Sequence, residues 1–340
     1  MNTHNKTQPA VVTAAHTYRS ERPTTLVASN SYSDNDTRRL AVSAPRLSLR
    51  PQTDRDIVPS ILPETVNHHF LSACEMGCKH CFAPFTGCGK LPLSALKALI
   101  LKVAQAPLAP WMTKPRRLNF VGGEPTRHRH FLELVQYAHE CGLRVSIVTN
   151  GYSFIRNGIP KELKILELVG ISIDSLNSNA NRLIGRAVGQ NTINEDQWLN
   201  LFEDLSKLGV PLKINTTLTK HNVGEDFSSF IPKAKPLRWK VFQAMVVLGE
   251  NCNGADRWKI ERPEYDEFIL RHTKAGVKVY AEPEDLMRGS YAMISPDGRF
   301  FDSAEGHQHY SNSILEVGIE QAWKQVQCDA ELFHERTRNY

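Results

Sequence analysis

Hydrophobic and polar residues follow two distinct periodicities from about residue 61 onward. Short runs of apolar, β-branched and aromatic residues predict six strands, at residues 65–71, 116–123, 144–151, 168–175, 211–219 and 238–247. Longer segments with apolar residues three or four positions apart predict helices at residues 92–105, 129–142 and 195–209. We expect Ser94 to cap the first of these helices, and Gly142 and Gly209 to end the other two.

This alternation of strands and helices predicts an α/β fold. A parallel strand needs a crossover connection to its neighbour, so repeated strand–helix units indicate a parallel sheet. Six such units are typical of a partial (βα)6 TIM-like barrel, in which functional side chains lie at the C-terminal ends of the strands. The residues that follow each predicted strand are therefore the candidates for chemistry.

The N-terminal region has a different composition from the rest. Residues 1–55 contain no Phe and no Trp, and are rich in Thr, Ser, Asn, Arg and Pro. Such a segment cannot bury enough apolar surface to offset the entropy that it would lose on ordering. The sequence therefore predicts a disordered tail at residues 1–55, a barrel at residues 56–285 and a C-terminal extension at residues 286–340.

The overall composition, with 41% hydrophobic and 23% charged residues, is that of a soluble protein. The net charge of +5 is too small and too dispersed to indicate binding to duplex nucleic acid. No apolar run is long enough to span a bilayer and no secretory signal is visible, so we expect a cytoplasmic protein that does not contact membranes. The seven cysteines, an odd number, agree with a reducing compartment.

Three cysteines follow the first predicted strand with the spacing C-x3-C-x2-C: Cys74, Cys78 and Cys81. Disulfides would require an oxidising compartment. A structural zinc site usually has four protein ligands, and Cys88 or His80 could supply the fourth. An ordinary electron-transfer cluster would also need a fourth thiol, for which only Cys88 is near. The remaining interpretation is a [4Fe–4S] cluster on three thiolates, with one iron open to a small chelating molecule.

Polar residues and glycines stand at the ends of the next three strands. Gly122 and Gly123 would let the backbone approach a ligand closely, and Glu124 could accept a hydrogen bond from an ammonium group. Asn150 can offer both a donor and an acceptor to a ribose, and Ser172 ends the fourth strand. Ordinary turns with solvated side chains are the alternative at each position.

The last two predicted strands carry cations at alternating positions. Arg238 and Lys240 share one face of the sixth strand, and Lys213 lies on the fifth. Cations inside an α/β sheet are costly unless an anion meets them. Together with Arg117 on the second strand they could converge on one polyanion, for which a triphosphate is a natural candidate. The alternative is an edge strand with a solvated face.

The sequence resembles the viperin-like radical S-adenosylmethionine (SAM) enzymes, and their prokaryotic members in particular. The resemblance covers about residues 61–325 and is carried by "VNHHF", "CEMGCKHCF", "NFVGGEP", "VSIVTNG", "RLIGR", "LKIN", "LRWKVFQ", "GENC" and "SYAMI". "RWKVFQ" and "NRLIGR" are not general radical SAM motifs, which makes the resemblance specific. It implies a radical SAM partial barrel whose C-terminal extension covers the site.

The resemblance also implies roles for individual residues. A [4Fe–4S] cluster would be held by Cys74, Cys78 and Cys81, with SAM on its open iron. Contacts to SAM would come from Gly122, Gly123, Glu124, Asn150, Ser172 and Arg186. Contacts to a nucleotide would come from Asn67, Arg117, Lys213, Arg238 and Lys240. Tyr291 is a candidate donor to a late radical, and its alternative role is that of a buried core tyrosine.

The implied reaction converts a ribonucleoside triphosphate into its 3′-deoxy-3′,4′-didehydro form. A 5′-deoxyadenosyl radical would abstract the C4′ hydrogen, and the 3′-hydroxyl would leave as water. The product has no 3′-hydroxyl and would terminate chains made by viral polymerases, which explains the antiviral role of the family. The implied partners are the nucleotide and an electron donor such as flavodoxin or ferredoxin, and we expect a monomer.

Several positions depart from the animal members of this family. Animal viperins have lysine at the position of Arg117, serine at that of Val121 and cysteine near that of Ser303. The N-terminal membrane helix and the C-terminal tryptophan of the animal proteins have no counterpart in this sequence. The sequence does not predict which base is preferred. Two other hypotheses are a radical SAM enzyme for a peptide or sugar nucleotide, and an interaction protein whose zinc or cluster uses Cys88.

Overall fold

A single sheet of ten strands organises the described part of the chain. The structure is a computed structural model and describes residues 62–85, 88–110 and 112–337, so the predicted tail at residues 1–55 lies outside the described residues. The strand order is β10-β9-β8-β1-β2-β3-β4-β5-β6-β7. The pairs β8–β1 and β1–β2 through β6–β7 are parallel, whereas β8–β9 and β9–β10 are antiparallel. The strands are β1 Thr65–His69, β2 Arg117–Val121, β3 Arg144–Thr149, β4 Leu168–Ser172, β5 Leu212–Leu218, β6 Arg238–Gln243, β7 Tyr280–Glu282, β8 Ala292–Ile294, β9 Arg299–Asp302 and β10 His309–Ser313.

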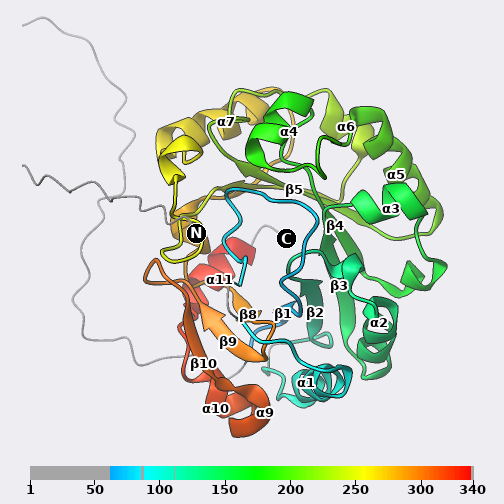
Figure 1. The fold of residues 1–340 in the computed structure, drawn as a ribbon, viewed down its shortest axis with the longest axis vertical. Coiled ribbons are helices and arrows are strands. Elements are labelled where there is room, and N and C mark those ends of the chain that lie inside the picture. The colour runs from blue at the N-terminus through cyan, green and yellow to red at the C-terminus, as the bar shows by residue number, and fades with distance from the viewer. Residues whose placement is uncertain (1–61, 86–87, 111, 338–340) are drawn as a thin grey trace, which may run out of the picture. The chain divides into compact units, whose positions relative to one another are not determined.

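Helices cover the outer face of this curved sheet, as Figure 1 shows for α1 to α7. They are α1 Leu93–Gln105, α2 Phe131–Glu140, α3 Tyr152–Asn157, α4 Ser178–Ile184, α5 Glu195–Lys207, α6 Phe230–Ala234, α7 Arg262–Lys274, α8 Glu284–Met287, α9 Ile314–Val317, α10 Ile319–Trp323 and α11 Ala330–Thr337. Three 3-10 turns are η1 Pro125–Arg127, η2 Lys161–Ile165 and η3 Ala255–Arg257. None of the helices in the described ranges is long and apolar enough to cross a membrane.

The six predicted strands and three predicted helices are all present, and the parallel α/β barrel is confirmed. The cap predicted for α1 was wrong, because Pro92 occupies the N-cap position and Ser94 lies inside the helix. Helix α5 begins at a capping box in which Asn194 accepts from the backbone N–H of Gln197. Strands β7, β8, β9 and β10 were not predicted from the hydrophobic pattern.

The two faces of the sheet differ in character. Side chains that point outward are fully buried against the helices, and include Val66, Leu118, Ile147, Ile171 and Ile214. Side chains at the alternate positions point to the inner face, where most are polar. In strand register these are Asn67 beside Asn119, Gly170 beside Lys213, Lys213 beside Arg238, and Asn215 beside Lys240. The interior of the barrel is therefore the polar, cationic side.

The region after β7 continues the same sheet, because β8 pairs with β1. The boundary predicted between residues 285 and 286 falls inside α8. That residues 56–285 and 286–340 form separate domains stays a prediction. Helix α11 brings Arg336 against the ring of Tyr291, so the C-terminal region contributes side chains to the inner face.

A buried arginine connects the segment before β1 to the end of α1 through hydrogen bonds. Arg116 is 1% exposed and donates hydrogen bonds to five backbone carbonyl oxygens, those of Leu62, Pro63, Val103, Ala106 and Pro107, at 2.8–3.2 Å. Burial lowers the pKa of its guanidinium to about 10, so the group stays charged at neutral pH. The segment that leads into the cysteine loop is thereby held by one side chain.

Candidate active site

Backbone hydrogen bonds connect one side of the cysteine loop after β1 to the end of β2. The backbone N–H of Gly123 donates to the carbonyl of Leu71, and that of Glu124 donates to the carbonyl of Ala73, both at 2.8 Å. A Cβ atom on Gly123 would overlap the carbonyl oxygen of Ala73. Gly122 has a φ of +141°, which favours glycine. The two predicted glycines therefore allow the close packing of these two segments.

Backbone hydrogen bonds connect the other side of the loop to the end of α4. The N–H of Gly77 donates to the carbonyl of Gly185 at 3.1 Å, and the N–H of Lys79 to that of Ile184 at 2.9 Å. Gly185 has a φ of +89°, and a Cβ there would overlap the carbonyl oxygen of Gly77. The sulfur of Cys78 lies 3.8 Å from the same Gly185 carbonyl. Residues that are far apart in the sequence thus fix the loop from both sides.

All three cysteines of the loop are free thiols. Burial raises the pKa of Cys78 to about 12 and also raises the pKa values of Cys74 and Cys81, while Arg186 acts in the opposite direction on each. Neutral thiols are therefore favoured until a strong cation binds them. Iron supplies such a charge, and thiolates are its usual ligands in iron–sulfur clusters.

Glu124 is a fully buried carboxylate at the end of β2. It accepts hydrogen bonds from the hydroxyl of Thr149 at 2.6 Å and from the N–H of Asn150 at 2.7 Å. Thr126 donates to it through both its N–H and its hydroxyl, at 3.1 and 2.8 Å. Burial raises the pKa of Glu124 and these hydrogen bonds lower it, with a net upward shift. Its carboxylate joins the ends of β2 and β3.

Asn150 directly follows β3 and lies next to the cysteine loop. Its amide nitrogen is 3.9 Å from the sulfur of Cys74 and 3.2 Å from a carboxylate oxygen of Glu75. Ser172 lies on the inner face of β4, in register with Asn215 on β5. Both residues are therefore at the C-terminal ends of their strands, on the side of the loop.

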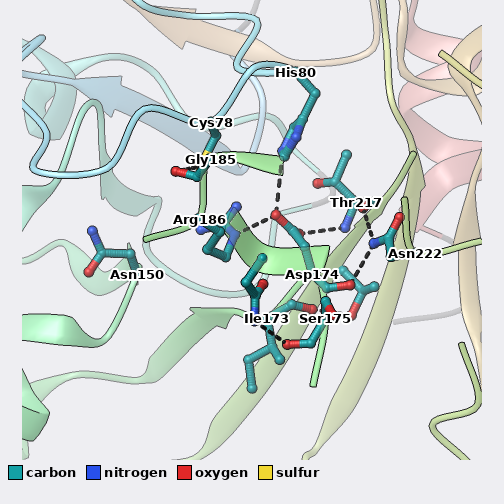
Figure 2. A network of polar contacts seen from close by, with 12 residues as sticks. Cys78, His80, Asn150, Ile173, Asp174, Ser175, Gly185, Arg186, Thr217 and Asn222 are labelled. Carbon is teal, nitrogen blue, oxygen red and sulfur yellow. Dashed lines mark hydrogen bonds and ion pairs between the residues drawn. The ribbon is translucent and has the colours of Figure 1, made fainter. Parts of the chain in front are cut away.

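Arg186 belongs to a buried ionic network around Asp174, drawn in Figure 2. The Nε of Arg186 donates to Asp174, which is fully buried. The N–H of Thr217 donates to the second oxygen of Asp174 at 2.9 Å, and Nε2 of His80 lies 3.5 Å from the first. The carboxylate therefore holds the guanidinium, the cysteine loop and β5 together. Asp174 was not among the predicted site residues, although its place in "SIDS" at a strand end was a usable signal.

The positive charge of Lys213 is balanced less by neighbouring carboxylates than the charges of Lys240 and Arg117 are. Burial, followed by the neighbouring Lys240, lowers its pKa to about 7. Among the residues that the structure describes, no hydrogen-bond acceptor or carboxylate is paired with it. Its side chain occupies the space that Gly170 leaves open, since a Cβ there would lie 2.9 Å from Cε of Lys213.

The other predicted cations surround Lys213. Lys240 forms an ion pair with Glu282, and burial lowers the pKa of this lysine to about 8. Arg238 is in register with Lys213 on the next strand. Arg117 lies at the N-terminal end of β2, where its Nε donates to Glu167 at 2.6 Å. Arg117 is thus near Lys213 but already has a carboxylate partner.

Tyr291 takes part in a buried polar group of the inner face. Its hydroxyl donates to Glu282, and the guanidinium of Arg336 lies 3.7 Å from the centre of its ring. Burial raises the pKa of Tyr291 well above its ordinary value, so it keeps its proton. Glu282 and Arg336 were not predicted. Both lie in segments without a motif, and only the fold brings them to this tyrosine.

Asn67 lies on the inner face of β1. Its side-chain oxygen accepts from the amide of Asn119 at 2.7 Å, and the oxygen of Asn119 accepts from the hydroxyl of Ser146 at 2.9 Å. These three side chains form a polar row across β1, β2 and β3. The structure thus places Asn67, Ser172, Lys213, Arg238 and Lys240 on the inner face, Glu124, Asn150 and Arg186 around the cysteine loop, and Arg117 at the N-terminal end of β2.

Comparison with known proteins identifies the family. The model of the Radical SAM superfamily matches residues 69–231. The S-adenosylmethionine-dependent nucleotide dehydratase of Flammeovirga pacifica is 36% identical over 289 residues, which cover 84% of this chain and 96% of the relative. The chain belongs to the SAM-dependent nucleotide dehydratases. A relative with the same name from Oncorhynchus mykiss is 33% identical and covers 83% of this chain and 81% of its own length, whereas the match spans only 57% of the relative from Lacinutrix mariniflava.

Solved structures of two proteins with bound SAM have the same fold as this nucleotide dehydratase. SuiB of Streptococcus suis bound to SAM has a TM-score of 0.56 at 17% identity, and covers 82% of this chain and 68% of its own. The protein anSMEcpe with bound SAM and a peptide has a TM-score of 0.56 at 15% identity, and covers 81% of this chain and 82% of its own. At these identities the similarity concerns the fold alone.

As a radical SAM enzyme the dehydratase uses a [4Fe–4S] cluster and SAM, and its residues fit both. Three free thiols stand in one loop, and the guanidinium of Arg186 lies beside two of them. The thiol of Cys88 instead contacts the hydroxyl of Tyr310 at 3.8 Å.

Proposed function

We propose that this SAM-dependent nucleotide dehydratase converts a ribonucleoside triphosphate into its 3′-deoxy-3′,4′-didehydro analogue. The observation that supports the substrate is that Lys213, which is half-buried and has no paired acceptor among the described residues, lies beside Arg238 and near the buried Lys240 on the inner face. Buried cations are costly without an anion, and a triphosphate supplies one of matching charge. The proposal includes a cytoplasmic monomer, a one-electron donor such as flavodoxin or ferredoxin, and a product that terminates chains made by viral polymerases.

The residues of the chain have the following roles in the proposal. Cys74, Cys78 and Cys81 hold the cluster. The carboxylate and ammonium ends of SAM are held by Gly122, Gly123, Glu124, Ser172 and Arg186, and its ribose by Asn150. Asn67 lies near the nucleotide, and the triphosphate is held by Arg117, Lys213, Arg238 and Lys240. When bound, the cluster and SAM supply a 5′-deoxyadenosyl radical that removes the hydrogen at C4′.

Buried side chains of the inner face can support the last steps of such a reaction and exclude water from it. Tyr291 keeps its proton and donates a hydrogen bond to Glu282. After the 3′-hydroxyl has left as water, the phenol can therefore pass one electron to the nucleotide while its own proton moves to Glu282, and the external electron donor then restores the tyrosine. Burial raises the pKa of Glu282, but its ion pair with Lys240 acts in the opposite direction. The pKa of Glu282 is lowered overall, so the carboxylate stays ionised. A closed, fixed set of polar groups of this kind limits side reactions of a radical.

The test of the function is a product assay. The protein is purified without oxygen, supplied with iron and sulfide, and given SAM, dithionite and one of the four ribonucleoside triphosphates. We expect one nucleotide to give both 5′-deoxyadenosine and a nucleotide lighter by one water, detected by mass spectrometry. 5′-Deoxyadenosine without a dehydrated nucleotide would overturn the substrate. A peptide or sugar nucleotide would then be tested in its place.

Nucleotide binding is expected to take up protons at about pH 8. In the free enzyme Lys213, with a pKa of about 7, is mostly neutral at this pH, and Lys240, with a pKa of about 8, is partly neutral. Their neighbours are the cations Arg117 and Arg238 and the carboxylate Glu282, and a triphosphate adds the missing negative charge. Bound triphosphate therefore raises both pKa values, and its affinity falls as the pH rises from about 7 to 9.

Proton uptake is measured by titration calorimetry at pH 8 in two buffers of different ionisation enthalpy. The Lys213→Met variant should bind the triphosphate more weakly and take up fewer protons. The exposed Lys164→Met variant is the matched control and should behave like the parent protein. Affinity that is independent of pH in the parent protein would contradict the assigned triphosphate site.

Asp174→Asn should weaken SAM binding about tenfold or more. Asparagine keeps the acceptor for Thr217 but loses the ionic hydrogen bond to Arg186, and such bonds contribute about 1.5–3 kcal/mol. The dissociation constant of SAM is measured by equilibrium dialysis, together with the iron content. Asp266→Asn, at an exposed position of α7, should leave both values unchanged. Unaltered SAM affinity in Asp174→Asn would show that Asp174 does not position Arg186.

A further inference from the structure

The cysteine loop approaches solvent at two short stretches, one at Ala73 and Cys74 and one at Gly77 and Lys79. Gly77, directly before Cys78, is exposed, and a Cβ atom built on it would meet no described atom within 4 Å. Lys79, directly after Cys78, is exposed as well. The backbone bonds to Gly185 and Ile184 fix the second stretch against α4. An electron carrier that is too large to enter the barrel can therefore approach the cluster from the side on which Cys74, Gly77 and Lys79 are exposed.

Other segments adjoin these stretches and make one surface with them. Arg127 of η1 lies 3.8 Å from Glu75 of the loop. Lys79 is close enough to His221 to add to the effect of burial in lowering the pKa of that histidine. We call the surface formed by residues 73–80, 126–130, 179–185 and 220–221 the cluster-loop face.

The cluster-loop face is strongly basic. Its cations are all exposed, and they are Lys79, Arg127, Arg129, Arg182 and Lys220. Its one carboxylate is Glu75, whose side chain is only 10% exposed and lies near Arg127. Arg182 and Lys220 donate to neutral oxygens, those of Asn179 and of the Asp256 backbone, and so keep their full charge.

An exposed apolar side chain lies among these cations. Leu183 is 51% exposed and directly precedes Ile184, whose carbonyl accepts from Lys79. Small apolar contacts within a charged surface are typical of short-lived protein complexes, in which charge steers the encounter and little area is buried.

We propose that the cluster-loop face docks a small acidic protein that carries one electron at low potential. One electron leaves the reduced carrier and enters the oxidised cluster beside Gly77 and Cys78, with no bond formed and no proton moved. This inference rests on the proposed function only in that the enzyme must be reduced for radical formation. It does not depend on which substrate is dehydrated.

The experiment compares two double variants that change the net charge equally. Arg129→Glu/Arg182→Glu alters the cluster-loop face. Lys207→Glu/Lys274→Glu alters the ends of α5 and α7, which lead into β5 and β7 at the opposite edge of the sheet. The probe is flavodoxin, reduced by its reductase and NADPH, and dithionite is the small-molecule alternative that needs no docking. Both assays measure 5′-deoxyadenosine from SAM without added nucleotide, so that the result is independent of the substrate.

We expect the cluster-loop variant to bind flavodoxin about tenfold more weakly at low salt and to lose the flavodoxin-driven rate by a similar factor. Binding is measured by calorimetry with oxidised flavodoxin, which does not require turnover. The dithionite-driven rate and the iron content should match the parent protein, and the control variant should be unaffected in every assay.

Three results would overturn the proposal. The first is an equal loss in both double variants, which would reflect net charge alone. The second is a loss with dithionite as well, which would place the arginines in cofactor binding. The third is unchanged flavodoxin binding together with lost affinity for single-stranded RNA, which would assign the face to nucleic acid. Failure to dehydrate any nucleotide would affect the proposed function alone, because radical formation is scored separately.

Discussion

Replacing Cys78 with alanine abolishes SAM cleavage and nucleotide dehydration together, by a factor on the order of 10³ or more. The cluster would lose one of three thiolates in a loop that offers no replacement at the same place. The fold should survive, because the backbone bonds from Gly77 to Gly185 and from Lys79 to Ile184 hold the loop without this sulfur. Iron content, the visible absorption of the cluster, circular dichroism and 5′-deoxyadenosine formation measure the outcome.

Cys88→Ala is the matched control for this prediction. Cys88 lies only seven residues after Cys81, but its thiol contacts Tyr310 rather than the other cysteines. This variant should keep its iron, its colour and its activity. Loss of the bound metal in both Cys78→Ala and Cys88→Ala would favour a four-ligand zinc or electron-transfer site and contradict the radical SAM assignment of the loop.

Arg116→Ala should destabilise the fold by on the order of 4 kcal/mol. Five carbonyl oxygens lose their donor, and each buried acceptor left unpaired costs about 1–3 kcal/mol unless water reaches it. Such a loss should lower the melting temperature by about 10 °C in a domain of this size. The free energy of unfolding is measured by urea titration of the apo protein.

Arg156→Ala provides the comparison, because Arg156 is an exposed arginine of α3. Its free energy of unfolding should stay within about 0.5 kcal/mol of the parent protein. If Arg116→Ala is as stable as the parent protein, water or a rearranged backbone must donate hydrogen bonds to the five carbonyl oxygens. Arg116 would then not be the residue that connects β1 to α1.

Much of the barrel could be predicted because its signals are local. Each predicted parallel strand is a short apolar run, and three of these strands are followed by a segment with helical spacing, so β1 to β6 and the long helices α1, α2 and α5 are visible in the sequence. The alternation rule also placed Lys213, Arg238 and Lys240 correctly on the inner face, because side chains alternate strictly along a strand.

The missing parts of the site depend on contacts between distant residues. Glu282 lies on a strand of three residues, too short to show a pattern. Its partners are Lys240 on β6 and Tyr291 directly before β8, both distant from it in the sheet order or in the chain. Arg336 lies on α11, where its side chain could as well have been solvated. The pairing of Asp174 with Arg186 depends on how α4 returns to the sheet, which no spacing rule determines.

The pairing of β1 with β8 has a consequence for how the protein folds. Val66 pairs with Ala292, so the two strands are 226 residues apart in the chain. Until β8 has been synthesised, one edge of β1 has open backbone donors and acceptors, and closing so long a loop is slow. Closure of the sheet at this seam should therefore be a late folding step, and while it is pending β1 is the strand most exposed to mispairing with other chains.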